Sequence, residues 1–264
     1  MAKQPVAGSA GHQKTLSGLL RDNARRTGLH QVFADFCELS AVAVSNKVDK
    51  LQFAAREARY FDIIKRYERD EIERFAHMFA VLTEWLGCGF ADRLGELFMS
   101  LEMGDRWRGQ FFTPFSVSST MAQLALGDVR AQFAEKPFMT FCEPACGAGG
   151  MLIACADAIN SQTIDYTRKM HAVGIDIDAT AVHMAYLQLS LYGVPAIVIH
   201  GNALALEERA HWVTPMHVYG GWDHRLQRHR KEQAPPAEDE PAPLQVATAG
   251  AAVVARRVEQ MGLF

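Results

Sequence analysis

The stretch Phe141-Cys142-Glu143-Pro144-Ala145-Cys146-Gly147-Ala148-Gly149-Gly150-Met151 decides the fold that we expect. It is typical of a buried strand that ends in a glycine-rich turn, with a helix starting near Met151. The three glycines permit positive φ and let a ligand approach the backbone closely. A helix that starts behind such a turn offers unpaired N–H groups to an anion. A glycine turn alone is weak support for a binding site, because many strand-to-helix turns bind nothing.

Strands and helices alternate on either side of this turn. Short strands are expected at 139–143, 172–176 and 196–200, and helices at 115–131, 151–160 and 179–192. Strand–helix alternation with short loops predicts a parallel sheet with right-handed crossovers. We therefore expect an α/β, Rossmann-like fold.

The N-terminal part of the chain has a different pattern. Residues 1–14 are small and polar and are predicted to be disordered, and helical apolar spacing then predicts a helical lobe over 15–105. The charged run at 62–74 is typical of a solvated helix face. We place the α/β domain at 106–225 and a linker with a C-terminal tail at 226–264, in which 232–245 is rich in Pro, Ala and acidic residues.

Composition limits the classes of function. The formal net charge is −3, so the chain has no overall basic character for nucleic acid, and DNA contact would need a local patch or a partner. The five cysteines (37, 88, 142, 146 and 155) form no Cys-x-x-Cys pair, which favours buried reduced thiols over disulfides or zinc. We expect no membrane span, and a cytoplasmic location.

Two segments carry a resemblance to a known family. Glu143-Pro144-Ala145-Cys146-Gly147-x-Gly149-Gly150 resembles the S-adenosylmethionine-binding motif of adenine-N6 DNA methyltransferases, in particular the modification subunits of type I restriction systems. Upstream, Gly109-Gln110-Phe111-Phe112-Thr113-Pro114 resembles the segment that folds over the methionine end of the cofactor in that family. By itself this upstream segment is equally compatible with a loop that buries two aromatic rings.

The resemblance implies a set of cofactor-binding residues. Phe112, Thr113 and Pro114 would lie over the methionine end, and Glu143, Ala145, Gly147 and Gly149 around the turn. Asp176, which ends the second strand, would hold the ribose, a role that acidic residues also have in dinucleotide folds. Asn202 would contact the adenine, where the family has Asp; Asn keeps an acceptor oxygen but has no charge. Asp178 is expected to cap the following helix.

The family's target-handling turn, Asn/Asp-Pro-Pro-Phe/Tyr, is not found in this sequence. The one Pro-Pro pair, Pro235-Pro236, lies between Ala234 and Ala237, and 211–223 has no similar turn. We therefore name no catalytic residue and expect the cofactor half of the fold, truncated after the third strand. The free edge of the first strand needs cover, from the 212–222 segment or from a second chain.

Residues near the C-terminus suggest further contacts. Histidines 211, 217, 224 and 229 lack typical metal-ligand spacing, so we expect no metal site. The basic run Arg225, Arg228, Arg230 and Lys231 is compatible with phosphate contact or with a solvated helix end. The terminal Gln260-Met261-Gly262-Leu263-Phe264 resembles peptides that dock on the replication sliding clamp, with Gln260, Leu263 and Phe264 as anchors; chance or a self-packed helix end is the alternative.

Two functions follow as expectations. The chain is a DNA adenine-N6 methyltransferase-like protein that binds S-adenosylmethionine and reaches DNA through a partner, such as a specificity subunit or a second copy of itself. Alternatively, it is a non-catalytic accessory protein that interferes with restriction or modification, or associates with the sliding clamp. Cofactor binding without methyl transfer would favour the second.

Overall fold

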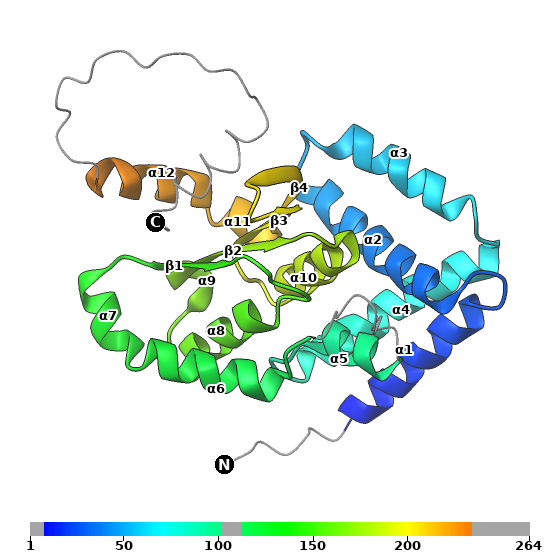
Figure 1. The fold of residues 1–264 in the computed structure, drawn as a ribbon, viewed down its shortest axis with the longest axis horizontal. Coiled ribbons are helices and arrows are strands. Elements are labelled where there is room, and N and C mark those ends of the chain that lie inside the picture. The colour runs from blue at the N-terminus through cyan, green and yellow to red at the C-terminus, as the bar shows by residue number, and fades with distance from the viewer. Residues whose placement is uncertain (1–7, 102–111, 234–264) are drawn as a thin grey trace.

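A computed structural model describes residues 8–101 and 112–233, which form an α/β unit beside a helical lobe (Figure 1). The lobe contains α1 (Ser9–Asn23), α2 (Leu29–Val48), α3 (Phe53–Ile64), α4 (Arg69–Gly87) and α5 (Arg93–Ser100). None of the described helices has the length and hydropathy needed to cross a bilayer.

The first helix begins earlier than the composition indicated. α1 starts at Ser9, so the prediction of disorder for 1–14 is wrong for residues 9–14, while residues 1–7 lie outside the described part. Leu16 and Leu20 are fully buried in the core of the lobe, and α1 packs along α4. The Trp85 indole N–H donates to Ser9 Oγ at 2.8 Å and ties the start of α1 to α4.

The α/β unit contains the three predicted parallel strands. β1 (Met139–Glu143), β2 (Met170–Asp176) and β3 (Ala196–Asn202) are adjacent in that order, and Glu143 is level with Gly174. The helices after β1 and β2 are α8 (Gly150–Ser161) and α10 (Ala179–Leu191), and the short α9 (Tyr166–Lys169) precedes β2. The predicted α/β fold with an N-terminal helical lobe is confirmed.

The α10 helix joins the two parts of the molecule. It packs on β2 and β3 and also against α2 and α5 of the lobe. This double contact explains why α10 has no polar face: Met184 and Leu187 enter the core of the lobe, and Val182 and Tyr186 enter the core beside the sheet. The lobe is therefore held directly over the strand ends of the sheet.

The sheet has a fourth strand, so the prediction that it ends after the third is wrong. β4 (Glu207–Val213) runs antiparallel to β3 after a tight reversal at Leu206, whose φ is 55°. Its charged residues obscured the strand pattern, but Trp212 is buried against Tyr186 of α10. Arg56 of the lobe covers this strand, donating to the His211 carbonyl at 2.7 Å and stacking on Trp212 at 4.0 Å.

Two short helices follow β4: α11 (Pro215–Tyr219) and α12 (Trp222–Gln233). The linker expected from 226 is therefore wrong as far as Gln233, and residues 234–264 lie outside the described part. Trp222 anchors α12, because it is fully buried against Phe138, which precedes β1, and against His171 of β2. Trp212, in contrast, lies at the far edge of the sheet, so the 212–222 segment does not pair with the edge of β1.

The segment before β1 forms two helices where one was expected over 115–131. These are α6 (Phe115–Leu126) and α7 (Val129–Glu135). Gly127 separates them with a φ of 53°, and Asp128 caps α7 by accepting from the Arg130 N–H at 3.0 Å. Positive φ ends a right-handed helix, and a capping carboxylate restarts one.

Candidate functional site

The glycine turn after β1 requires at least two of its glycines. Gly147 has a φ of 54° and Gly149 a φ of 89°. A Cβ on Gly147 would lie 2.8 Å from the Phe112 ring, and one on Gly149 would lie 3.3 Å from Ala185 of α10. Gly147 therefore accommodates an aromatic ring, and Gly149 allows α8 and α10 to approach each other.

Asp176 holds the turn against the end of β2. One carboxylate oxygen accepts from the Gly147 N–H at 2.8 Å, and the other accepts from the Asp178 N–H at 2.9 Å. Asp178 is the N-cap of α10 and accepts from the Ala181 N–H at 2.9 Å, in agreement with the predicted cap. Asp176 therefore stabilises the glycine turn, and Asp178 caps α10.

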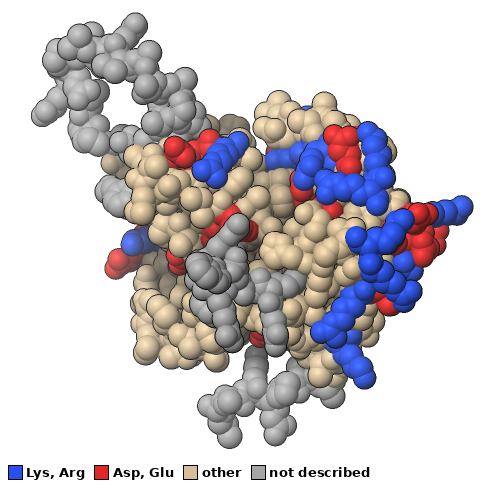
Figure 2. All heavy atoms as spheres, turned by 45° about the vertical axis from the view of Figure 1, so that its right-hand side comes forward, with Lys and Arg blue, Asp and Glu red and all other residues tan. Residues whose placement is uncertain are grey.

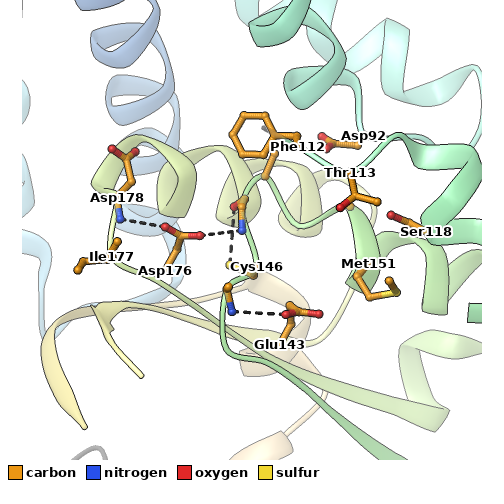
Figure 3. Close-up of a pocket in the computed structure, with 14 residues that line it drawn as sticks. Asp92, Phe112, Thr113, Ser118, Glu143, Cys146, Met151, Asp176, Ile177 and Asp178 are labelled. Carbon is orange, nitrogen blue, oxygen red and sulfur yellow. Dashed lines mark hydrogen bonds between the residues drawn. The ribbon is translucent and has the colours of Figure 1, made fainter. Parts of the chain in front are cut away.

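A cavity of about 510 Å³ opens beside the turn (Figure 3). This volume lies within the range of about 300–1,000 Å³ for small-molecule sites. The start of α8 lies at the cavity, together with a wall from the lobe and the segment before α6. The lining residues are Asp92, Phe112, Thr113, Ser118, Glu143, Ala145, Cys146, Gly147, Ala148, Gly150, Met151, Asp176, Ile177 and Asp178.

The charged side chains described in this cavity are all acidic. Among residues 8–101 and 112–233, its lining includes the four carboxyl groups of Asp92, Glu143, Asp176 and Asp178, and no Lys, Arg or His. Burial raises the pKa of Glu143, and a hydrogen bond from the Ala145 N–H partly offsets that rise. Burial also raises the pKa of Asp92 to about 6, although hydrogen bonds from Gln188 and Gly95 act in the opposite direction. Such a cavity favours cationic ligands and disfavours phosphates.

The structure brings together most of the predicted cofactor residues. Six of them line the cavity: Phe112, Thr113, Glu143, Ala145, Gly147 and Asp176. Pro114 and Gly149 lie just outside it, as the N-caps of α6 and α8. Asn202 also lies outside the cavity wall, and its Oδ1 accepts from the Leu204 and Ala205 N–H groups at 3.0 and 3.2 Å. The predicted clamp anchors Gln260, Leu263 and Phe264 lie outside the described residues.

Other lining residues had not been identified from the sequence. Ser118, Met151 and Ile177 adjoin predicted segments, so proximity along the chain was an available signal. Asp92 had no such signal, because it belongs to the lobe and resembles an ordinary helix cap in sequence. It reaches the cavity only because α10 brings the lobe to the turn: its Oδ1 and the Ala148 carbonyl both accept from Gln188 Nε2 at 2.8 Å.

The histidines and arginines near the C-terminus pack against the sheet. His217 hydrogen-bonds His171 at 2.8 Å and Asp223 at 3.1 Å, and both histidines are buried. Arg225 stacks on Trp222 at 3.6 Å. Within residues 8–101 and 112–233, no group of three or more potential ligands could hold a metal ion.

Comparison with known proteins gives one family match. Residues 97–218, a little under half of the 264-residue chain, match the family model described as N-6 DNA methylase. The matched region begins in α5 and ends in α11, so it includes the cavity wall from Phe112 to Asp178.

Similar solved structures are distant. One is described as a class I S-adenosylmethionine-dependent methyltransferase from Listeria monocytogenes, with 16% identity over 77% of this chain and a TM-score of 0.43. Another is the methyltransferase subunit of a type I restriction-modification system from Streptococcus thermophilus, with 15% identity over 78% of this chain and a TM-score of 0.40. This chain spans 55% and 60% of their lengths, and likenesses of this size carry no weight for its function. The family match confirms the resemblance that the glycine turn suggested: over residues 97–218, this chain is similar to the N-6 DNA methylases.

Proposed function

We propose that the cavity beside Gly147 binds S-adenosylmethionine and that the chain is a DNA adenine-N6 methyltransferase-like protein. The observation that carries the proposal is the acidic cavity at a glycine turn, closed by an Asp at the end of the neighbouring strand. Nucleotides with several phosphates would be repelled by the four carboxyl groups, which have no basic side chain beside them among the described lining residues. A nucleoside that carries sulfonium and ammonium groups suits the same charges.

The roles of the residues follow from their hydrogen-bonding capacity. Each carboxylate oxygen of Asp176 accepts one backbone N–H and retains a lone pair that could accept from a ribose hydroxyl. Phe112 and Thr113 lie on the wall at which the methionine end would bind, as the family resemblance implies. Asn202 would need to exchange a backbone contact for the adenine amine, because its Oδ1 already accepts two N–H groups.

S-adenosylmethionine would supply a methyl group activated by its sulfonium centre. The receiving amine of adenine must also be held in place, and the sequence lacks the Asn/Asp-Pro-Pro-Phe/Tyr turn that does this in the family. We therefore propose that this chain does not transfer the methyl group alone, and that another subunit supplies the residues around the target base.

DNA contact is proposed through the same partner, a specificity subunit or a second copy of this chain. On the face in Figure 2, Lys and Arg gather over the lobe but alternate with Asp and Glu. Several basic side chains of the lobe are in ion pairs: Arg26 with Glu68 and Glu71, Arg59 with Glu38, Lys65 with Asp62, Arg66 with Asp35 and Arg74 with Asp70. A face of mixed, paired charges offers weak attraction to phosphates.

Calorimetric titration with S-adenosylmethionine tests the binding step. We expect saturable binding to the wild-type protein and a loss of at least about tenfold in affinity for Asp176→Asn, because Asn weakens the hydrogen bond to a ribose hydroxyl and can accept only one of the two backbone N–H groups that Asp176 holds. Asp178→Asn is the matched control, since Asn also caps helices and the same formal charge is removed. Absence of binding to the wild-type protein would refute the proposal.

A non-catalytic accessory role is the second candidate, and the missing target-handling turn favours it for the chain in isolation. Transfer of a tritiated methyl group to unmethylated DNA distinguishes the two. Binding without transfer, and without rescue by a specificity subunit, would favour the accessory role. Transfer that appears on adding the partner would favour the methyltransferase subunit.

A further inference from the structure

Asp92 is a buried carboxylate with one oxygen engaged and one oxygen available to the cavity. Only 3% of the residue is exposed. Its Oδ1 accepts from the Gly95 N–H and from Gln188 Nε2, both at 2.8 Å, and so caps α5 and ties the lobe to α10. Among the described residues, no donor is hydrogen-bonded to Oδ2. Capping of α5 and the contact to α10 therefore involve only Oδ1 of the carboxylate.

The second oxygen lies at the start of α8. A Cβ on Gly150 would be 3.2 Å from Oδ2, so a side chain larger than glycine at this position would crowd the carboxylate. Asp92 belongs to the same wall of the cavity as Thr113 and Ser118, whereas Asp176 and Asp178 lie on the other side (Figure 3). The Asp92 carboxylate is therefore directed to the end of the cavity opposite the predicted ribose site.

A buried carboxylate is stable in its charged form only beside a cation or several donors. The described residues that line the cavity include no Lys, Arg or His that could serve as this cation. The N-terminus of α8 supplies a partial positive charge, but the unused oxygen of Asp92 can also accept a donor from a ligand. The described part of the protein thus provides an acceptor at Oδ2 with no basic partner, which suits a ligand that brings its own cationic donor.

We infer that Oδ2 of Asp92 binds the α-ammonium group at the amino-acid end of the cofactor, which makes the helical lobe part of the cofactor site. This inference rests on the proposed function. The ammonium group is chosen over the sulfonium group because it has N–H donors, and a sulfonium has none. A purely structural role, in which Asp92 only caps α5, is the alternative.

Two ligands that differ only at the amino-acid end separate these roles. S-adenosylhomocysteine has the ammonium and carboxylate groups, and 5′-methylthioadenosine lacks both; neither has a sulfonium charge. We expect Asp92→Asn to weaken S-adenosylhomocysteine binding by about 10- to 100-fold, as one charge-assisted hydrogen bond is lost, and to change 5′-methylthioadenosine binding by less than about twofold. Titration calorimetry measures both ligands on the full-length protein.

Asp178→Asn is the control for a general loss of negative charge in the cavity. It should affect both ligands equally, because Asp178 lies away from the amino-acid end. Unchanged S-adenosylhomocysteine binding by Asp92→Asn, or an equal loss for both ligands, would overturn the inference while leaving the proposed function intact. Failure of the wild-type protein to bind either ligand would instead refute the proposed function.

The pH dependence of binding provides a second measurement. Between pH 7 and 5, wild-type affinity for S-adenosylhomocysteine should fall as Asp92 becomes protonated, since burial places its pKa at about 6. Glu143, Asp176, Asp178 and Cys146 face the same cavity, Glu96 of α5 also raises the pKa of Asp92, and all five groups remain in both proteins. The affinity of Asp92→Asn for S-adenosylhomocysteine should therefore change less between pH 7 and 5 than that of the wild type, because only the protonation of Asp92 has been removed. Identical pH dependence of the two affinities would contradict the inference.

Discussion

Replacing Gly147 by alanine tests whether the turn depends on the backbone conformation and close ring contact described above. Gly147 has a φ of 54°, in the left-handed region. Its Cα lies under the Phe112 ring, so that an added Cβ would be 2.8 and 2.9 Å from two ring carbons. The substitution therefore combines backbone strain with a displaced aromatic side chain.

The two effects have separate magnitudes. A left-handed residue with a Cβ costs about 1–2 kcal/mol. Phe112 can relieve the overlap by moving, but it then loses its edge-to-face contact with Phe98, where the ring centroids are 5.3 Å apart. Such a pair is worth about 0.5–1.5 kcal/mol. Together they lower the free energy of unfolding by about 1.5–3.5 kcal/mol.

Urea unfolding followed by circular dichroism measures this loss. Gly87→Ala is the control, because Gly87 is the last residue of α4, has ordinary φ and has no neighbour within 4 Å of the added Cβ. This control should leave stability unchanged or raise it slightly.

A double-mutant cycle with Phe112→Ala separates the ring contact from the backbone strain. In the Phe112→Ala protein, Gly147→Ala should cost only the backbone part, about 1–2 kcal/mol. If the Gly147→Ala protein is as stable as the wild type, the reasoning about the turn is refuted. An equal cost in both backgrounds would refute the contribution of the ring.

Three other predictions concern the anchor of α12, the buried histidines and the charge of the cavity. Trp222→Ala should lower the free energy of unfolding by about 3–5 kcal/mol, because the indole is fully buried, and should expose α12 to trypsin; Tyr219→Ala, at a 73% exposed residue, should change it by less than about 0.5 kcal/mol. Stability should decrease as the pH is lowered from 7 to 5, because burial lowers the pKa of His183 from 6.5 to about 4 and that of His171 in the same direction, so the unfolded chain binds more protons below pH 6.5. By pH 5, the lowered pKa of His183 alone reduces the free energy of unfolding by about 2 kcal/mol. Asp92 acts in the opposite direction below pH 6, because its pKa is raised in the folded protein. The urea midpoint of His183→Gln should therefore depend less on pH than that of the wild type. Finally, S-adenosylmethionine should bind about tenfold more tightly than S-adenosylhomocysteine, because its sulfonium charge lies among four carboxyl groups; equal affinities in calorimetry would contradict the electrostatic argument.

Local physical chemistry was sufficient for the α/β core. Strand alternation, the helix restart after Gly149 and the cap at Asp178 are short-range effects, and the three parallel strands lie where the sequence predicts them. The glycine motif also identified Glu143, Ala145 and Gly147, which line one cavity in the structure. A local motif can do this because β1, the turn and α8 are consecutive along the chain.

The remaining features depend on contacts between residues far apart in the sequence. The helix at Ser9 is stabilised by Trp85, α12 is anchored by Phe138 and His171, and β4 is covered by Arg56 from the lobe. Each pattern was ambiguous locally: a polar N-terminus, a basic run and a charged strand.

Asp92 is the clearest example of a site residue that the sequence alone did not indicate. The sequence by itself determined a strand, a glycine turn and a helix that together form one side of the cavity. Only the tertiary structure brought a helix cap from the lobe to that site, through Gln188 on a helix buried on both sides. The physical reason is that capping and turn geometry are set within a few residues, whereas the composition of a cavity wall is set by which helices pack together.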